Sequence, residues 1–356
     1  MDDRRVALEQ WAIAEIHQIE GLSITGKMIP VSGDASFRRY FRLCYLGGSW
    51  IAVDAPADKE NNPKFVNIAQ AWYQHGIAVP RVIAHDFLKG FMLLEDFGST
   101  LLWEPLHAEE ATAQTVEGLY KQAIDLLLEI QPLASNNLPA YNHDLLTSEM
   151  QLFTDWLCKK LLKIKLSTAE QTMFADSFEL LAQHALKQPQ VTVHRDYHSR
   201  NLMVKEDNSL GVIDFQDAVA GPATYDLVSL LRDCYVRWPE QKVQELMAYY
   251  WEKARPLGLY LDEWQNFQKD FDWMGMQRHL KAAGIFARLY LRDGKEGFLK
   301  DIPNTCQYLV EVSAKYEELA ELNAWLTKHL MPKLSKLPMT SSKEGAGSKE
   351  ETKETE

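Results

Sequence analysis

The sequence has 356 residues, of which 46% are hydrophobic and 25% are charged, and its formal net charge at pH 7 is −12. This length can form one large domain or two lobes with a shared cleft, and the composition is ordinary for a soluble globular protein. The acidic balance, together with the lack of any Lys/Arg run, argues against a nucleic-acid partner.

The first part of the chain predicts a leading helix and then a sheet with one inserted helix. Apolar side chains recur at helical spacing over residues 4–19. Residues 37–46 have strand composition, Gly47-Gly48-Ser49 is a hairpin signal, and residues 50–55 form the expected return strand. The other elements expected here are a helix over 63–74 and strands over 82–86 and 91–95.

From residue 108 the chain becomes mainly helical. Short strands are expected at 191–193, 202–204 and 211–213, the last two as a hairpin. The expected helices are 109–131, 144–164, 168–187, 224–236, 240–255, 262–290 and about 303–330. This order predicts an α+β fold of two lobes, a β-rich N-lobe over 1–95 and a helical C-lobe over 96–337. The polar tail, residues 338–356, is expected to be disordered because it has almost no apolar side chains to bury.

One short stretch carries the chemistry. Residues 194–201 read His-Arg-Asp-Tyr-His-Ser-Arg-Asn, and residues 213–215 read Ile-Asp-Phe. Asp196 is the candidate catalytic base, since a hydroxyl that attacks a phosphoryl group must lose a proton. Asn201 follows five positions later and Asp214 ends the partner strand, so a hairpin between them brings two oxygens together that can bind Mg²⁺. The pattern indicates phosphoryl transfer from ATP, and the alternative is a structural turn with an Asx cap.

Three other residues of this stretch, His194, His198 and Arg200, are polar and lie beside the candidate base. His194 is expected to be structural and to hydrogen-bond the loop backbone. For His198 and Arg200 two interpretations stay open, contact with substrate or support of the loop.

These residues resemble the aminoglycoside phosphotransferase/choline kinase superfamily, the small-molecule relatives of the protein kinases. Residues 214–218 read Asp-Phe-Gln-Asp-Ala, Gly221-Pro222 follows almost at once, and Tyr225-Asp226-Leu227 comes next. Protein kinases carry a glycine after Asp-Phe and a long activation loop. The resemblance therefore implies a small-molecule acceptor, a nucleotide-binding N-lobe, and a C-lobe with the catalytic loop and acceptor site.

A closer resemblance is to the branch of bacterial anomeric kinases that act on N-acetylmuramate and N-acetylglucosamine in cell-wall recycling. It extends over about residues 5–330. It implies transfer of the γ-phosphoryl group of ATP to the C1 hydroxyl of the free amino sugar. The segments that carry it are Gly33 to Arg42, Val53 to Pro56, Leu93 to Gly98, Gln277 to Lys281 and Gly284 to Leu289.

The phosphate-binding part departs from the protein-kinase pattern. The Gly-rich loop is absent, and Gly33-Asp34-Ala35-Ser36 stands at the expected hairpin tip, with Ser36 as a candidate phosphate donor. Asp54 stands where a kinase has its phosphate-binding lysine. Strand alternation puts Arg38 and Arg42 on one face of the preceding strand and Arg39 on the other. We hypothesise that one of these arginines supplies the missing charge and pairs with Asp54.

The adenine and acceptor sites are less sharply indicated. Ala52 suits the roof over an adenine, and the backbone of Leu94, Glu95 and Asp96 is expected to connect the lobes and meet the adenine edge. The candidate acceptor residues are Asp217, Arg232, Arg278 and His279, each with a structural alternative. Other acceptors, namely choline, ethanolamine, an aminoglycoside or homoserine, stay open, as does a non-catalytic nucleotide- or sugar-binding regulator.

Cysteine spacing and the termini indicate the compartment. Cys44, Cys158, Cys234 and Cys306 are far apart, which argues against a zinc site or a disulfide framework. The N-terminal segment has no apolar signal core, and no apolar run approaches the ~18 residues of a membrane span. We therefore expect a cytoplasmic protein with no membrane association, and nothing implies a protein partner.

Overall fold

The computed structural model describes residues 2–21, 28–31, 37–45, 47–135 and 137–337. The expected hairpin tip, Gly33 to Ser36, and the expected disordered tail, 338–356, lie outside the described residues. The chain forms two compact units. Unit 1 contains the described residues of Met1–Asn142 and His184–Met274, and unit 2 those of His143–Gln183 and Gly275–Glu356. The lobe boundary at residue 95 stays a prediction.

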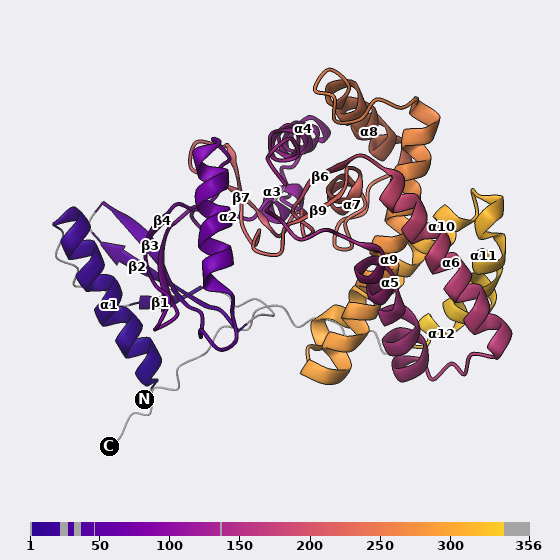
Figure 1. Ribbon diagram of the computed structural model, residues 1–356, viewed down its shortest axis with the longest axis horizontal. Helices are drawn as coiled ribbons and strands as arrows, with labels where there is room; N and C mark the ends of the chain where they lie inside the picture. Colours follow the sequence, from indigo (N-terminus) through magenta and orange to yellow (C-terminus); the bar gives the residue numbers. More distant parts are fainter. Residues whose placement is uncertain (1, 22–27, 32–36, 46, 136, 338–356) are drawn as a thin grey trace. The chain divides into compact units, whose positions relative to one another are not determined.

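Unit 1 begins with a helix and an antiparallel five-stranded sheet in the order β1-β2-β3-β5-β4. Figure 1 shows α1 and α2 on either side of this sheet. The side chain of Asp2 accepts a hydrogen bond from the Arg5 N–H and caps α1. The elements are α1 (Asp3–Glu20), β1 (Met28–Pro30), β2 (Arg39–Tyr45), β3 (Gly48–Asp54), α2 (Asn62–Gln74), β4 (Val82–Asp86) and β5 (Phe91–Glu95).

The two faces of the sheet carry different side chains. Strand alternation puts Phe41 and Ala52, which are paired in register, on the face that packs against Leu8 and Ala12 of α1. The opposite face carries Ile51 and the other alternate residues of β3 and β5. Helix α1 therefore supplies the apolar cover for one face of this sheet.

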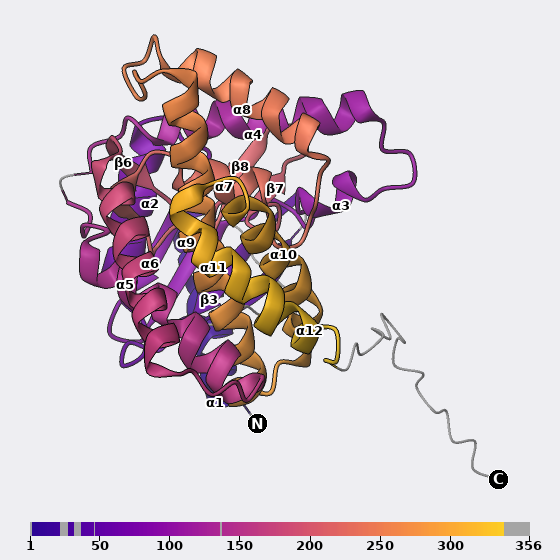
Figure 2. The same ribbon diagram turned by 90° about the vertical axis from the view of Figure 1, so that its right-hand side faces the viewer.

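The rest of unit 1 holds the catalytic segment. Two small antiparallel sheets, β6 with β9 and β7 with β8, lie among helices. Helices α4 and α8 lie side by side (Figure 2). The elements are α3 (Trp103–Leu106), α4 (Ala113–Ile130), β6 (Gln190–Val193), β7 (Leu202–Val204), β8 (Leu210–Val212), β9 (Val219–Pro222), α7 (Tyr225–Leu231), α8 (Glu240–Ala254) and the start of α9 (Trp264–Asp293).

Every secondary-structure element among the described residues of unit 2 is a helix. A Cβ atom placed on Gly284 of α9 would lie 2.6 Å from the carbonyl oxygen of Leu152 and 2.6 Å from the N atom of Phe153. The two backbones therefore approach closely where α5 passes into a π-helix. The elements are α5 (His143–Leu152), the π-helix (Phe153–Leu161), α6 (Thr168–Lys187), the rest of α9, 3₁₀ segments at Glu296–Asp301 and Glu317–Leu319, α10 (Ile302–Ser313), α11 (Ala320–Trp325), a second π-helix (Leu326–Leu330) and α12 (Met331–Leu334).

The α+β order predicted from the sequence is confirmed, and three helix predictions are corrected. The expected helix 144–164 changes to π geometry at Phe153. The expected helix 224–236 ends at Leu231, because the Asp233 carboxylate binds the Tyr235 N–H and so competes with the helical pattern. The expected helix 303–330 breaks after Ser313, where Asn323 donates to the Val310 carbonyl group. Among the described residues, none of the helices has the length and apolar character needed to cross a membrane.

Candidate active site

The catalytic loop connects β6 to β7 and presents Asp196. Its carbonyl oxygen accepts hydrogen bonds from the Asn201 side-chain amide at 2.9 Å and from the His198 N–H at 3.1 Å. The Asp196 residue is half-buried. The backbone at Asp196 is thus fixed by two other residues of the same loop.

A buried carboxylate anchors the start of this loop. Asp226, on α7, accepts the backbone N–H of His194 at 2.6 Å and that of Arg195 at 3.0 Å. Arg195 has a φ of 80°, an unfavourable region for a residue with a Cβ. Asp226 has no exposed surface. Two charge-assisted hydrogen bonds to one carboxylate stabilise this turn immediately before Asp196.

His194 is a structural residue of the loop, as expected. Its Nε2 atom lies 2.9 Å from the Ile213 carbonyl oxygen, and its Nδ1 atom accepts the Asp196 N–H at 3.2 Å. Complete burial lowers the pKa of His194 to about 4. The imidazole is therefore neutral at pH 7 and joins the loop to the strand that precedes Asp214.

Asn201 and Asp214 meet as the hairpin pattern predicted. The Asn201 Nδ2 atom lies 3.5 Å from the Asp214 Oδ2 atom, and Gln216 Nε2 donates to Asp214 Oδ1 at 2.6 Å. Asp214 has a φ of 65°. No cluster of three or more His, Cys, Asp or Glu side chains suited to a metal occurs among the described residues. A carboxamide and a carboxylate fit Mg²⁺, which takes one or two protein ligands and completes its shell with phosphate and water.

The far end of the loop is fixed by a second buried carboxylate. Asp233 Oδ2 accepts the Ser199 hydroxyl at 2.6 Å and the Ser199 N–H at 3.3 Å. The Arg200 guanidinium lies 3.9 Å from the ring centre of Tyr235, and the His198 ring packs edge-on against the same ring. These contacts give Arg200 and His198 a supporting role in the loop.

Aromatic packing connects α2 to the catalytic hairpin. The Phe65 and Phe215 ring centres are 4.9 Å apart, and those of Trp72 and Phe215 are 5.7 Å apart. The Val212 N–H donates to the Ala78 carbonyl oxygen at 2.7 Å. The residue after Asp214 is thus held directly by α2.

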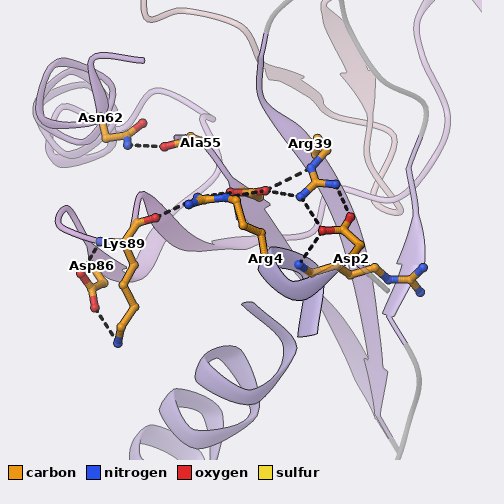
Figure 3. Close-up of polar contacts among 9 residues, drawn as sticks. Asp2, Arg4, Arg39, Ala55, Asn62, Asp86 and Lys89 are labelled. Atoms are coloured by element: carbon orange, nitrogen blue, oxygen red, sulfur yellow. Dashed lines mark hydrogen bonds and ion pairs between the residues drawn. The ribbon is translucent and has the colours of Figure 1, made fainter. Parts of the chain in front are cut away.

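Of the three arginines expected as possible partners of Asp54, Arg39 pairs with it. Arg38 and Arg42 bind other carboxylates. The Asp54 carboxylate binds Arg4 Nη2 of α1 and Arg39 Nη2 of β2, each at 2.5 Å. Figure 3 shows the Arg4 and Arg39 side chains pointing toward one another, with Arg39 also contacting Asp2. Register puts Asp54 on the face covered by α1, so this network ties α1 to the sheet.

The two candidate phosphate-binding arginines have other partners. Arg42 binds both carboxylate oxygens of Asp96, at 2.5 and 3.0 Å. Burial raises the pKa of Asp96, but hydrogen bonds from Arg42 and Ser49 outweigh it and lower that pKa below its usual value. Arg38 Nη2 lies 2.9 Å from Glu60 Oε2. The candidate Ser36 lies outside the described residues.

The candidate adenine-contacting residues are placed as follows. The Ala52 side chain is fully buried and packs in the core against α1. Leu94, at the end of β5, lies opposite Ile51 on the other face of the sheet. The N–H of Glu95 donates to the Arg81 carbonyl oxygen at 2.9 Å.

The candidate acceptor residues belong to both units, Asp217 and Arg232 to unit 1 and Arg278 and His279 to unit 2. Asp217 is exposed, three residues after Asp214, and its carbonyl oxygen accepts from Arg195 Nη1 at 3.5 Å. Arg232 is 1% exposed and binds Asp272 at 2.6 Å and Glu240 at 3.2 Å, which makes it part of a buried ion-pair network. Arg278 and His279 are buried in unit 2, where the His279 ring stacks on Tyr308.

Sequence reasoning did not assign the anchoring roles of Asp226 and Asp233. For Asp226 the available signal was an acidic residue within an apolar helix, since a buried carboxylate requires hydrogen-bond donors. It also did not identify Glu60, whose partners lie more than 20 positions earlier in the chain.

Comparison with other proteins identifies the family. Residues 27–259 match the family model described as phosphotransferase enzyme family. The chain is 42% identical over 304 residues to the N-acetylmuramate/N-acetylglucosamine kinase of Pseudomonas aeruginosa, with 84% of this chain and 88% of that protein covered. It is 39% identical over 329 residues to the enzyme of the same name from Neisseria meningitidis, with 91% and 96% covered.

Solved structures show the same fold. Choline kinase LicA from Streptococcus pneumoniae superposes with a TM-score of 0.59 at 13% identity, with 87% of this chain and 100% of that chain covered. The predicted kinase-like α+β fold is thereby confirmed. The chain belongs to the phosphotransferase enzyme family and is an ATP-dependent phosphotransferase.

Proposed function

We propose that this protein transfers the γ-phosphoryl group of ATP to the C1 hydroxyl of N-acetylmuramate or N-acetylglucosamine. The observation that carries the proposal is that the Asn201 side chain contacts both the backbone of Asp196 and the carboxylate of Asp214. It is supported by relatives of 39–42% identity that bear these two sugars in their names. The product is a sugar 1-phosphate, which suits cell-wall recycling, and we place the reaction in the cytoplasm, where ATP is made.

Each residue of the proposed site has one task. The Asp196 carboxylate orients the C1 hydroxyl and accepts its proton as the sugar oxygen attacks the γ-phosphorus atom. The bond from the γ-phosphorus atom to the bridging oxygen breaks, and ADP leaves. Asn201 and Asp214 would hold Mg²⁺, which supplies charge stabilisation to the phosphates. His194 stays neutral, and Asp226 keeps the turn before Asp196 in place.

The nucleotide is proposed to bind the sheet face opposite α1. Ala52 and Asp54 are occupied on the α1 face. Ile51, Val53 and Leu94 project from the other face by strand alternation. We therefore propose Leu94 and its neighbours on that face, with the backbone of Glu95 and Asp96, as the adenine-binding part.

The acceptor assignment is tested by a coupled ADP assay with N-acetylmuramate, N-acetylglucosamine, choline and kanamycin. We expect turnover with an amino sugar and a product whose phosphorus NMR signal couples to the C1 proton. Asp196→Asn should lower kcat by about 10²–10⁴-fold and leave ADP affinity unchanged. Asp176→Asn, an exposed carboxylate on α6, is the matched control and should keep full activity. Turnover with choline or kanamycin alone would overturn the proposal.

A further inference from the structure

Three arginines lie immediately before β2 or within it, and two of them, Arg39 and Arg42, are bound by aspartate side chains. Arg39 binds Asp54 and Asp2 on the face covered by α1. Arg42 binds both oxygens of Asp96, and also the Ser99 hydroxyl at 2.7 Å and the Gly98 carbonyl oxygen at 2.6 Å. Through these contacts Arg42 fixes the segment that follows β5.

Arg38 is in a different environment. It is 5% exposed, and its Nη2 atom lies 2.9 Å from Glu60 Oε2. The other oxygen of the same carboxylate, Oε1, accepts the Phe37 N–H at 3.1 Å. Glu60 therefore holds two consecutive residues, one through its backbone and one through its charge. This fixes the chain at the point where it enters β2.

The position of Arg38 connects it to the magnesium-binding end of the site. Its guanidinium lies 5.5 Å from the ring centre of Phe65, and that ring is 4.9 Å from the ring of Phe215. Phe215 directly follows Asp214. Glu60 stands just before α2, whose N-cap is Asn61. A chain of contacts thus runs from the buried cation through α2 to the residue beside the metal ligand.

We propose that Arg38 and Glu60 replace the lysine–glutamate ion pair of the protein kinases, with Arg38 as the cation for the nucleotide phosphates and Glu60 as its positioning residue. This inference rests on the proposed ATP-dependent function. Asp54 stands at the usual lysine position and is itself paired with Arg4 and Arg39, so the positive charge for the phosphates must come from another residue. A buried guanidinium paired with a carboxylate keeps its charge, and its planar array of N–H donors matches the geometry of phosphate oxygens.

The test separates phosphate binding from folding. Calorimetric binding of ADP with Mg²⁺, and of adenosine, would be compared for wild type, Arg38→Gln, Arg38→Lys and Glu60→Gln in the full chain. Arg38→Gln should weaken ADP binding by about 10- to 100-fold and leave adenosine affinity within about twofold. Arg38→Lys should recover part of the loss. Glu60→Gln should raise KM for ATP while KM for the sugar is unchanged.

Arg39→Gln is the matched control, because the neighbouring guanidinium lies on the other face of the sheet and should leave ADP affinity unchanged. Unaltered ADP binding in Arg38→Gln, or an equal loss for ADP and adenosine, would overturn the inference. If Arg38→Gln does not fold, the ratio of ADP affinity to adenosine affinity is measured for Arg38→Lys and Glu60→Gln, and an unchanged ratio in both would overturn the inference. Failure of amino-sugar turnover would contradict the proposed acceptor and leave this binding comparison intact.

Discussion

The Asn201 side-chain amide lies 3.5 Å from the Asp214 carboxylate, although the two residues are 13 positions apart. The β7–β8 hairpin brings them together, and the Ile213 N–H donates to the Asn201 carbonyl oxygen at 3.1 Å. The side chains therefore share one rigid frame, which is what a metal site with few protein ligands requires.

Removing either member of this pair should change the magnesium dependence. Asp214→Asn is expected to lower kcat by at least about 10²-fold, and Asn201→Ala to raise the Mg²⁺ concentration for half-maximal activity. A magnesium titration of the initial rate measures both. Asn208→Gly, at a φ of 62° in the turn of the same hairpin, should titrate as wild type does. Equal magnesium curves for all four proteins would contradict the assignment.

Loss of the Asp226 charge should affect both folding and catalysis. Asp226→Asn replaces one acceptor oxygen by an N–H₂ group that faces backbone donors, so we expect a loss of about 1–3 kcal/mol in unfolding free energy. The displaced turn should also reduce kcat at saturating substrates. Urea denaturation and steady-state rates check the two effects. Asp176→Asn should change the unfolding free energy by less than about 0.5 kcal/mol, and a similar small change in Asp226→Asn would refute the anchoring role.

Two helical glycines give a matched pair for packing. Gly284→Ala should destabilise unit 2 by about 1–3 kcal/mol, because its Cβ atom would lie 2.6 Å from the Leu152 carbonyl oxygen. Gly118 of α4 has no heavy atom within 4 Å of its Cβ position. Gly118→Ala should therefore stabilise the chain by about 0.5–1 kcal/mol. Chemical denaturation measures the unfolding free energy of both variants. If both substitutions changed it in the same direction, the close approach at Gly284 would be absent.

The buried histidine should make stability depend on pH. The pKa of His194 falls from 6.5 in the unfolded chain to about 4 in the folded one, so the unfolded state binds more protons between these values. Stability from this residue is complete above pH 6.5 and is lost as the pH falls toward 4. Between pH 7 and pH 5 the loss should be about 2 kcal/mol.

His194→Gln removes the titrating group and serves as the comparison. Its unfolding free energy should fall less between pH 7 and pH 5 than that of wild type. An identical fall in both proteins would assign the pH dependence to other groups.

The catalytic loop could be predicted from local sequence patterns, whereas pairings between distant segments of the chain could not. Asp196, Asn201 and Asp214 lie within 19 residues and one hairpin, so spacing alone brought them together. The partners of Asp54 come from α1, 50 positions earlier, and from β2. Strand alternation put Ala52 and Asp54 on one face, but only tertiary packing decides that α1 covers that face. Arg232 looked available for a substrate, yet its partner Asp272 is 40 positions away.

The position of Asp54 bears on how such enzymes are recognised in genome surveys. A filter that demands lysine at this strand position would class the chain as a pseudokinase. The carboxylate is engaged by Arg4 and Arg39 on the sheet face covered by α1, so its presence says nothing about catalytic competence. A filter that scores the catalytic loop together with an arginine just before β2 and an acidic residue just before α2 would retain chains of this kind.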